Sequence, residues 1–447
     1  SYLAFFSFPS ISIFSYDFLD FIPASTISAT YCLILCHKEP DFRWSRIGNV
    51  TQASIDVFMV FRGVYTPIKN PIIVCISNHL PRSSVFQEKV VPLLNKEQKK
   101  MVVEEKYMAR CIELARGGEG NTAPNPMVGA VIVHKGKIIG EGFHRKCGEA
   151  HAEVNAVASV RDEALLRDST IYVSLEPCSH YGKTPPCAEL IIRKGIPRVV
   201  VGTLDPFPEV SGRGVRMLRE AGIEVVTGVL EEEARALNPA FMTFQIRKRP
   251  YVYLKWAQSA DGFMDIRRED ASVPSVLLSS AETLRRVHRL RSEVAAIMVG
   301  TRTALLDNPS LTVRHWAGRS PVRVVLDRTL KLPVGSHLLD GAVPTLVFTA
   351  VEVESRPNVE YVQIDFGQEV LSQVLQYLYG QNLNSLMVEG GAELLESFLD
   401  AGLWDEAWVE TAPVVLGAGV KAPAVPGVLT GTEQRHEHLL ETWKQKA

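Results

Sequence analysis

The chain has 447 residues, of which 46% are hydrophobic and 22% are charged, and its formal net charge is -2. At about 100–200 residues per domain this length predicts two to four domains, and the composition is typical of globular proteins. The near-neutral charge argues against nucleic acid or a membrane surface as a partner and favours a small molecule.

The first hundred residues differ from the rest. Aromatic residues, Ser and Ile crowd residues 1–36, and no helical or strand period persists. The apolar stretch 2–22 is interrupted by Pro and Asp and lacks the positive region of a signal peptide, so no membrane span is expected. Met101 then precedes an amphipathic segment. We predict that residues 1–100 are not part of the working enzyme and are a translated upstream region. A poorly ordered extension or a targeting segment is the alternative.

From residue 101 onward, helices and strands are expected to alternate. The predicted helices of the first half are 107–116, 151–160, 187–193, 214–221 and 231–244, and its predicted strands are 128–133, 138–143, 170–175, 198–202 and 223–228. This alternation predicts a three-layer α/β domain over residues 101–247, ending in a linker at 247–250.

A second α/β domain is predicted over residues 248–447. Its expected strands are 251–257, 294–300, 323–327, 345–349, 385–389 and 406–415, with helices at 281–290, 369–379 and 392–401. No Gly-x-Gly-x-x-Gly follows its first strand, so a Rossmann-type nucleotide site is not supported. The last segment, 431–447, looks polar.

Seven cysteines, an odd number, argue against a disulfide framework. They favour a reducing, cytoplasmic location in which some thiols are free to bind metal.

The strongest chemical signal is His151-Ala152-Glu153, followed by Pro177-Cys178 and by Cys187. A catalytic zinc needs three protein ligands and one open position for water, and His151, Cys178 and Cys187 supply three. Glu153 is suited to move protons between that water and the substrate. This order of residues is typical of zinc-dependent nucleobase deaminases.

Local structure should bring these residues together. We expect a helix to start at His151, a strand to lead into Cys178, and the next helix to open at Cys187. Eight residues separate the two cysteines instead of the usual two, so the loop is long enough to contact substrate. Two alternatives remain open: a surface histidine with buried thiols, or a structural zinc with Cys147 as a fourth ligand.

A family resemblance extends across most of the chain beyond Met101. NPMVGA at 125–130, HAE at 151–153 and EPCSHYGKTPPC at 176–187 resemble the bifunctional riboflavin biosynthesis deaminase–reductases. The stretches KWAQSADG, TALLDNPSLTVR and VEGGAELLESFLDAGLWDE, which start at residues 255, 303 and 388, resemble their reductase half. The resemblance implies a cytidine-deaminase-like domain followed by a dihydrofolate-reductase-like domain, with Zn²⁺ and NADPH as cofactors.

The reactions implied by this resemblance are consecutive. The first is hydrolytic deamination of 2,5-diamino-6-ribosylamino-4(3H)-pyrimidinone 5′-phosphate. The second is reduction of the ribosyl chain to give 5-amino-6-(5-phosphoribitylamino)uracil. A phosphorylated pyrimidine is therefore the expected partner, and a homo-oligomer is the expected assembly.

The resemblance also implies site residues. In the deaminase, Asn125, His180 and Lys183 match substrate positions. In the reductase, the candidate catalytic residues are Lys255, Asp307 and Glu389. The positions that match substrate contacts are Ser275, Arg291, Leu311, Arg314 and Glu389. The positions that match cofactor contacts are Ala257, Thr303, Asp307, Gly391, Ala392, Glu393, Leu394, Leu395, Glu396 and Ser397.

Two of these features can also be argued from the residues. A lysine inside an apolar strand is costly unless it is paired, so Lys255 should face a carboxylate, which the sequence does not identify. The Gly390-Gly391 turn before a helix suits phosphate binding, although an ordinary tight turn would also use it.

The sequence departs from the family pattern between its first two reductase motifs. Leu277 stands where many relatives have Trp, and Arg267-Arg268-Glu269-Asp270 replaces a small Gly/Ser-rich loop. The choice of NADPH over NADH is therefore inherited from the family. Two rival interpretations remain. A deaminase acting on single-stranded nucleic acid would need a basic groove, and the intact HAE motif argues against a binding protein without activity.

Overall fold

The structure is a computed structural model that describes residues 96–181, 185–207 and 211–446. It also describes six two-residue strands earlier in the chain: β1 (Ser7–Phe8), β2 (Ile11–Ser12), β3 (Phe42–Arg43), β4 (Met59–Val60), β5 (Arg62–Gly63) and β6 (Ile73–Val74). The chain divides into two compact units, Ser1–Val103 and Glu104–Ala447. The prediction for residues 1–100 falls almost wholly outside the described residues and stays a prediction.

The first sheet of the second unit has the strand order β11-β10-β9-β7-β8. Its strands are β7 (Gly129–His134), β8 (Lys137–Phe143), β9 (Ser169–Leu175), β10 (Arg198–Thr203) and β11 (Glu224–Thr227). The accompanying helices are α1 (Lys96–Ala115), α2 (Ala152–Ala158), α3 (Cys187–Lys194), α4 (Arg213–Glu220) and α5 (Glu231–Ala236), with the 3₁₀ turns η5 (Arg116–Gly118) and η6 (Glu163–Asp168). Strands β9, β10 and β11 are parallel, and β7 is antiparallel to both of its neighbours.

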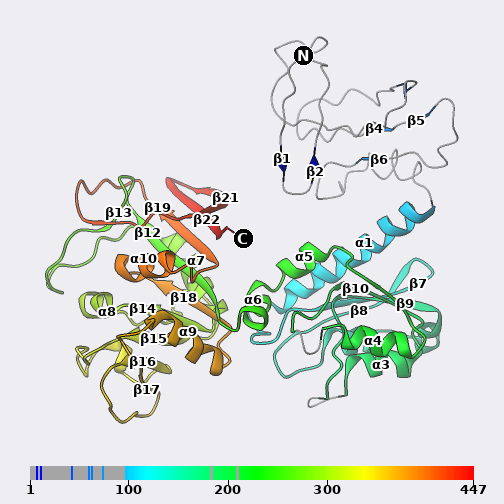
Figure 1. The fold of residues 1–447 in the computed structure, drawn as a ribbon, viewed down its shortest axis with the longest axis horizontal. Coiled ribbons are helices and arrows are strands. Elements are labelled where there is room, and N and C mark those ends of the chain that lie inside the picture. Colours follow the sequence, from blue (N-terminus) through cyan, green and yellow to red (C-terminus); the bar gives the residue numbers. More distant parts are fainter. Residues whose placement is uncertain are drawn as a thin grey trace. The chain divides into compact units, whose positions relative to one another are not determined.

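Helices cover both faces of this sheet, with α1 and α5 above it and α3 and α4 below it in Figure 1. Successive residues of a strand point to opposite faces, so a strand buried on both sides reads as a continuous apolar run. In β10, Val199 and Val201 pack with α2, α3 and α4, whereas Val200 packs with α1 and α5. The predicted three-layer arrangement is confirmed.

The predicted helix 231–244 is wrong in one respect, because two helices occupy this region. Helix α5 ends at Ala236 and α6 spans Pro239–Arg247. Pro239 cannot donate a backbone hydrogen bond and disfavours a helical conformation at Asn238, so it begins a new helix. The break has a use, since the Asn238 side chain accepts from Met127 N at 2.7 Å and donates to Met127 O at 2.9 Å.

The second sheet has nine strands in the order β17-β16-β15-β14-β18-β12-β19-β22-β21. They are β12 (Tyr251–Gln258), β14 (Ala296–Val299), β15 (Val322–Leu326), β16 (Thr345–Thr349), β17 (Val359–Gln363), β18 (Ser385–Glu389), β19 (Glu406–Thr411), β21 (Gly427–Arg435) and β22 (His438–Gln445). The small pair β13 (Phe263–Asp265) and β20 (Val420–Lys421) lies apart from this sheet. The seven strands from β17 to β19 are parallel, and the hairpin β21–β22 is antiparallel.

Helices again supply two apolar layers. They are α7 (Ala281–Glu293), α8 (Thr301–Asp307), α9 (Val370–Gly380) and α10 (Ala392–Asp400), with the 3₁₀ turn η7 (His337–Leu339). One core cluster includes Val374 of α9 and Phe398 of α10, and another includes Val287 of α7 and Ala304 of α8. None of the described helices is both long and apolar enough to cross a membrane.

The structure corrects one predicted strand of this half and adds elements that were not predicted. Most of the polar-looking residues 431–447 belong to β21 and β22, whose side chains are largely half-buried or exposed. The strand predicted over 406–415 stops at Thr411, just before Pro413, which cannot join a hydrogen-bond ladder. Helix α8 and strand β17 were not predicted. Helix α6 ends at Arg247 and β12 begins at Tyr251, while the domain boundaries themselves stay predictions.

Candidate active sites

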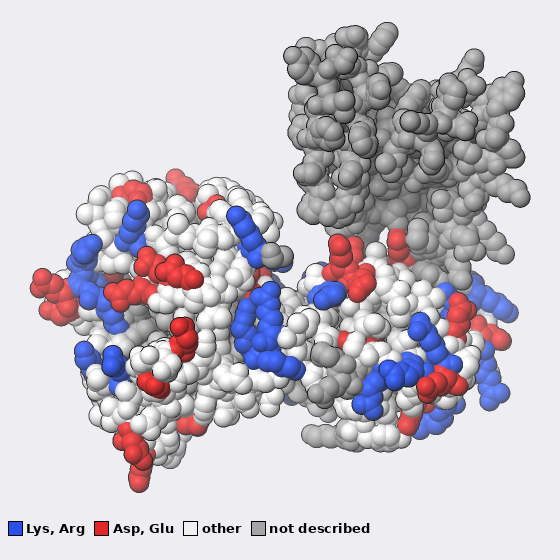
Figure 2. Space-filling model, in the orientation of Figure 1, with Lys and Arg blue, Asp and Glu red and all other residues white. Residues whose placement is uncertain are grey.

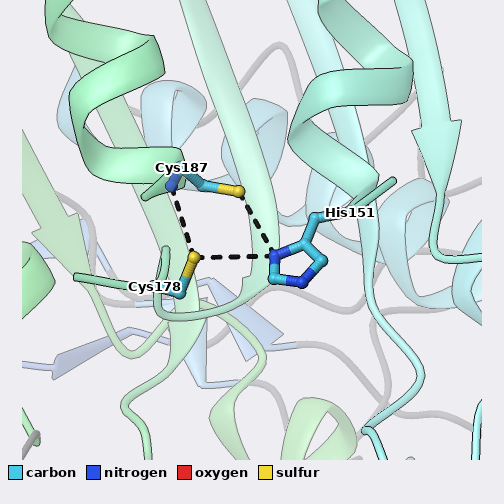
Figure 3. A group of neighbouring side chains, drawn as sticks. All are labelled: His151, Cys178 and Cys187. Carbon is cyan, nitrogen blue, oxygen red and sulfur yellow. Dashed lines mark hydrogen bonds between the residues drawn. The ribbon is translucent and has the colours of Figure 1, made fainter. Parts of the chain in front are cut away.

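The three predicted zinc ligands converge beside the N-terminal ends of two helices (Figure 3). His151 is the N-cap residue of α2, Cys178 follows the end of β9, and Cys187 is the first residue of α3. The Nδ1 atom of His151 lies 3.5 Å from Cys178 Sγ and 3.4 Å from Cys187 Sγ. Tetrahedral zinc with bonds of about 2.3 Å to sulfur and about 2.0 Å to nitrogen separates neighbouring ligand atoms by about 3.5 Å, so the group fits zinc.

The number of ligands indicates the type of site. Among the described residues, the group that could hold a metal consists of His151, Cys178 and Cys187, whose ligand atoms lie within 4.8 Å of one another. Cys147, the possible fourth ligand of a structural site, is exposed and is not in this group. Three ligands leave one position for water, as in catalytic zinc sites.

Backbone packing fixes the loop that bears Cys178. A Cβ atom on Gly214 of α4 would lie 2.1 Å from Pro177 O, so this close approach requires glycine. The buried carboxylate of Glu176 accepts backbone N–H groups from Asp205, Gly212 and Val215 at 2.9–3.1 Å. Glu176 was not singled out in the sequence, although it directly precedes the Pro-Cys motif.

Glu153 lies in the first turn of α2 and its side chain is buried. Burial raises the pKa of Glu153 to about 7, helped by the nearby Cys178. Hydrogen bonds to Cys187 and His151 lower the pKa of the Cys178 thiol, which favours the thiolate that binds metal. The site therefore pairs a metal-binding thiolate with a carboxyl group able to hold a proton near neutral pH.

Asn125 is oriented by a histidine that the sequence did not reveal. His144 is buried, its Nδ1 lies 3.1 Å from Ala150 O, and its Nε2 lies 3.3 Å from Asn125 Nδ2. A carbonyl can only accept, so Nδ1 carries the ring proton and Nε2 accepts from Asn125. Burial lowers the pKa of His144, which favours this neutral form. His180 is exposed on the loop after Cys178, and Lys183 lies outside the described residues.

In the nine-stranded sheet, parallel register identifies the carboxylate next to Lys255. Lys255 on β12 is the register partner of Glu389 at the end of β18. Arg291 of α7 binds Glu389 through Nη2 at 2.5 Å and Nε at 3.2 Å. Burial opposes ionisation of Glu389, but the charges of Arg291 and Lys255 lower its pKa. Glu389 is therefore held as a carboxylate between two cations.

The loop carrying Leu311 and Arg314 is held by α7. Leu311 is buried at a φ of 52°, a strained conformation for a branched side chain. Arg291 Nη1 donates to Thr312 O at 3.2 Å, and Arg314 N donates to His288 Nδ1 at 3.0 Å. The Arg314 side chain is exposed.

Most of the expected cofactor residues lie in the Gly390-Gly391 turn or directly after it in α10, and Thr303 lies beside the turn. These glycines have φ of 78° and 79°, and a Cβ on Gly391 would lie 3.0 Å from Thr303 Oγ1. Helix α10 starts directly after the turn and has no side-chain cap, so its first N–H groups are free for an anion. Within α10, Leu394 and Leu395 pack into the core, whereas Glu393, Glu396 and Ser397 are exposed.

Asp307 has a partner that sequence reasoning missed. Arg268 is buried and donates to Asp307 Oδ1 at 2.6 Å and to Asp265 Oδ2 at 2.7 Å. The atypical stretch 265–276 thus contributes an arginine bridge between two carboxylates. Ser275 and Leu277 of the same stretch are exposed.

Comparison with known proteins identifies both halves of the chain. Residues 101–203 match the cytidine and deoxycytidylate deaminase zinc-binding region, and residues 250–443 match the RibD C-terminal domain. Riboflavin biosynthesis protein RibD of Aquifex aeolicus is 43% identical over 327 residues, which cover 71% of this chain and 89% of that protein. RibD of Escherichia coli is 38% identical over 337 residues, which cover 71% of this chain and 90% of that protein.

Solved structures agree with these matches. A diaminohydroxyphosphoribosylaminopyrimidine deaminase/5-amino-6-(5-phosphoribosylamino)uracil reductase from Thermotoga maritima is 38% identical, with a TM-score of 0.69, and the match covers 78% of this chain and 100% of that one. RibD from Acinetobacter baumannii is 34% identical with a TM-score of 0.70 and the same coverage of both chains. The chain belongs to the RibD family.

Membership in the RibD family confirms the predicted fold class and the predicted pair of activities. The chain is a bifunctional enzyme of riboflavin biosynthesis, with a zinc-dependent deaminase domain followed by an NADPH-dependent reductase domain. The residues missed in the sequence are Glu176, His144, Arg268 and His288. For His288 there was a signal, because it precedes Arg291 by three residues, a spacing that places both on one face of a helix, although the predicted helix ended at residue 290 and α7 continues to Glu293.

Proposed function

We propose that the deaminase domain hydrolyses the 2-amino group of 2,5-diamino-6-ribosylamino-4(3H)-pyrimidinone 5′-phosphate, and that the reductase domain then reduces the ribosyl chain of the product with NADPH. The observation that carries the proposal is the convergence of His151, Cys178 and Cys187 beside the buried Glu153. The name of the Thermotoga maritima relative supports this choice of substrates.

In the deaminase, Glu153 moves the protons. A zinc ion held by His151, Cys178 and Cys187 would act as the Lewis acid that activates the water for attack on the ring carbon bearing the amino group. Glu153 takes a proton from this water and delivers protons to the ring nitrogen and to the leaving amine, which departs as ammonia. A pKa raised by burial to about 7 suits a group that must accept and donate in turn. Asn125 holds the pyrimidine edge, with its amide oriented by His144. His180 and Lys183 contact the substrate.

In the reductase, Lys255 and Glu389 lie at the reacting carbon, C1 of the ribosyl chain. NADPH supplies the hydride. Opening of the ribose ring requires a proton donor, and Lys255, the register partner of Glu389, is the candidate. The free N–H groups of α10 and the Gly391 turn receive the cofactor, together with Ala257, Thr303 and Asp307.

The phosphate of the substrate is assigned to arginines. Arg314 is exposed at the end of a strained loop. Arg291 uses three of its five donors on Glu389 and Thr312, which leaves two for an anion. Ser275 and Leu311 complete the expected substrate positions.

A coupled assay tests the proposal. Ammonia release and NADPH oxidation are followed with the diaminopyrimidinone ribosyl phosphate as substrate, using the parent chain and Glu153→Gln. We expect the parent to give both signals. The variant should give neither on this substrate, a loss of at least about 10²-fold, yet still oxidise NADPH with the deaminated intermediate. No ammonia from the parent with zinc present would refute the deaminase assignment.

The surface and the cysteines of the enzyme bear on its partners and its cellular location. Basic and acidic side chains are intermixed on the face seen in Figure 2, which offers little support for a nucleic-acid groove. Four free cysteines among the described residues fit a reducing cytoplasm. A homo-oligomer is proposed as well, and β21, which bears the exposed Val428 and Leu429, is an edge strand to which another chain could pair. Fractionation of the native cells tests the cytoplasmic location, and light scattering of the purified chain tests the homo-oligomer.

A further inference from the structure

His288 is a buried histidine within the reductase site. It lies on α7, one helical turn before Arg291, with 1% of its surface exposed. Its Nδ1 accepts the backbone N–H of Arg314 at 3.0 Å. A ring nitrogen that accepts carries no proton, so the neutral imidazole bears its proton on Nε2. Burial and the positive charge of Arg291 lower the pKa of His288 to about 4, which keeps the ring neutral at physiological pH.

The second ring nitrogen makes the residue costly for folding. Nε2 is buried and has no hydrogen-bond partner among the described residues. The ring of His315 packs edge-on against the ring of His288, with 4.7 Å between the ring centroids. An unpaired buried donor lowers stability, and an apolar side chain of similar size would avoid that loss. Packing alone therefore gives no reason for a histidine at this position.

The neighbouring loop supplies the reason. Leu311 holds a left-handed backbone conformation that a leucine adopts only when its surroundings enforce it. Three hydrogen bonds fix the residues after it: Arg291 binds Thr312 O, Ser320 Oγ accepts from Val313 N, and His288 accepts from Arg314 N. His288 and Arg291 are three residues apart on one face of α7, so one rigid helix holds both ends of this segment.

The same face of α7 also contacts Glu389, which the proposed reduction uses. Arg291 also binds Glu389, the register partner of Lys255. The position of the Arg314 backbone is therefore set by the helix that fixes Glu389.

We propose that His288 is a positioning residue of the reductase: by accepting the Arg314 N–H, it holds the strained Leu311–Arg314 loop so that the Arg314 guanidinium meets the phosphate of the substrate. This inference rests on the proposed function, because it takes the phosphorylated ribosylaminouracil as the substrate of this domain.

Two substitutions separate the acceptor role from packing. The Oδ1 atom of asparagine stands at the same distance from the backbone as Nδ1, so His288→Asn can keep the bond to Arg314 N. The amide of glutamine lies one carbon further out, so His288→Gln cannot. Both variants are assayed for NADPH oxidation with the deaminated ribosyl phosphate and with the same compound lacking its phosphate.

We expect His288→Gln to raise KM for the phosphorylated substrate about tenfold, which corresponds to the loss of one hydrogen bond's contribution, with kcat within about twofold. In His288→Asn, KM for the phosphorylated substrate should stay close to the parent value. The substrate without phosphate should give the same KM with all three proteins. If His288→Gln does not fold, Ser320→Ala, which removes the neighbouring bond to Val313 N, should raise the same KM.

Three results would overturn the proposal: an unchanged KM in His288→Gln, an equal rise in KM for both substrates, or an asparagine variant as weak as the glutamine variant. If His288→Gln does not fold, an unchanged KM in Ser320→Ala overturns it. A further check uses Arg314→Ala as background, in which His288→Gln should cause no additional rise. If the parent chain does not reduce the phosphorylated compound at all, the proposed function fails instead.

Discussion

Individual side chains decide whether the zinc site is catalytic or structural. His151 and the two cysteines form a group of three, and the backbone N–H of Cys187 donates to Cys178 Sγ at 3.3 Å. Such a bond from α3 favours the thiolate form of Cys178. Cys147 is close in sequence but exposed, so it serves as a matched control for loss of a thiol.

Removing a ligand thiol should empty the site. We expect one zinc per chain in the parent and in Cys147→Ser, and less than about a tenth of that in Cys187→Ser after mild chelation, because two remaining ligands bind zinc weakly. Metal content is measured by atomic emission after gel filtration. Loss of zinc from Cys147→Ser as well would instead indicate a four-ligand structural site.

Arg268 should stabilise the reductase by pairing with two carboxylates. Its guanidinium is buried between Asp265 and Asp307, whereas the adjacent Arg267 is exposed. Arg268→Ala leaves two neighbouring acids without a counter-charge and should lower the free energy of unfolding by about 3 kcal/mol. Arg267→Ala should lower it by less than about 0.5 kcal/mol. Urea unfolding measures both. KM for NADPH should rise only in Arg268→Ala if Asp307 contacts the cofactor. Equal stability of the two variants would contradict this account.

At the scale of elements, the structure shows what holds the zinc loop against α4. The Glu176 carboxylate accepts two N–H groups at the start of this helix and one from the preceding loop. A carboxylate at a helix N-terminus is favoured by unpaired N–H groups and by the helix dipole. The loop bearing Cys178 is thereby tied to α4.

Neutralising this carboxylate should loosen the zinc loop. Glu176→Gln exchanges one acceptor oxygen for an amide that faces N–H donors, so we expect a loss of about 2 kcal/mol of stability and weaker zinc binding. Glu220 is an exposed residue at the end of α4, so Glu220→Gln should change the free energy of unfolding by less than about 0.5 kcal/mol. Thermal unfolding and competition with a zinc chelator give the two readouts. If zinc affinity stays at the parent value in Glu176→Gln, the loop does not depend on α4.

Elements with a strong local pattern were predictable from the sequence. The ranges predicted for β16 and β18 match the observed ones, because each strand has three consecutive apolar residues, at 346–348 and 386–388, as expected inside a parallel sheet. The hairpin β21–β22 was missed, since half-exposed strands alternate weakly. Motif spacing placed the zinc ligands on the correct elements, but the Arg268 bridge depends on contacts between distant residues, which no local pattern encodes.

For the whole molecule, the two chemistries reside on different sheets. The zinc residues lie at the start of α2, at the start of α3 and after β9, around one point of the five-stranded domain, whereas Lys255 and Glu389 belong to the nine-stranded sheet. Each sheet has its own apolar core clusters. Each half-reaction should therefore survive loss of the other, and the intermediate is expected to pass through solution.

Mixing two single-site variants tests this separation. Glu153→Gln alone should give no ammonia, and Lys255→Met alone should release ammonia without oxidising NADPH. An equal mixture should oxidise NADPH after a lag, because the deaminated intermediate must accumulate before the second enzyme binds it. The lag should shorten as enzyme concentration rises, which stopped assays of ammonia and NADPH can follow together. If each variant retains its own half-reaction but the mixture oxidises no NADPH, the intermediate does not leave the chain that made it, and the two domains must act as a unit.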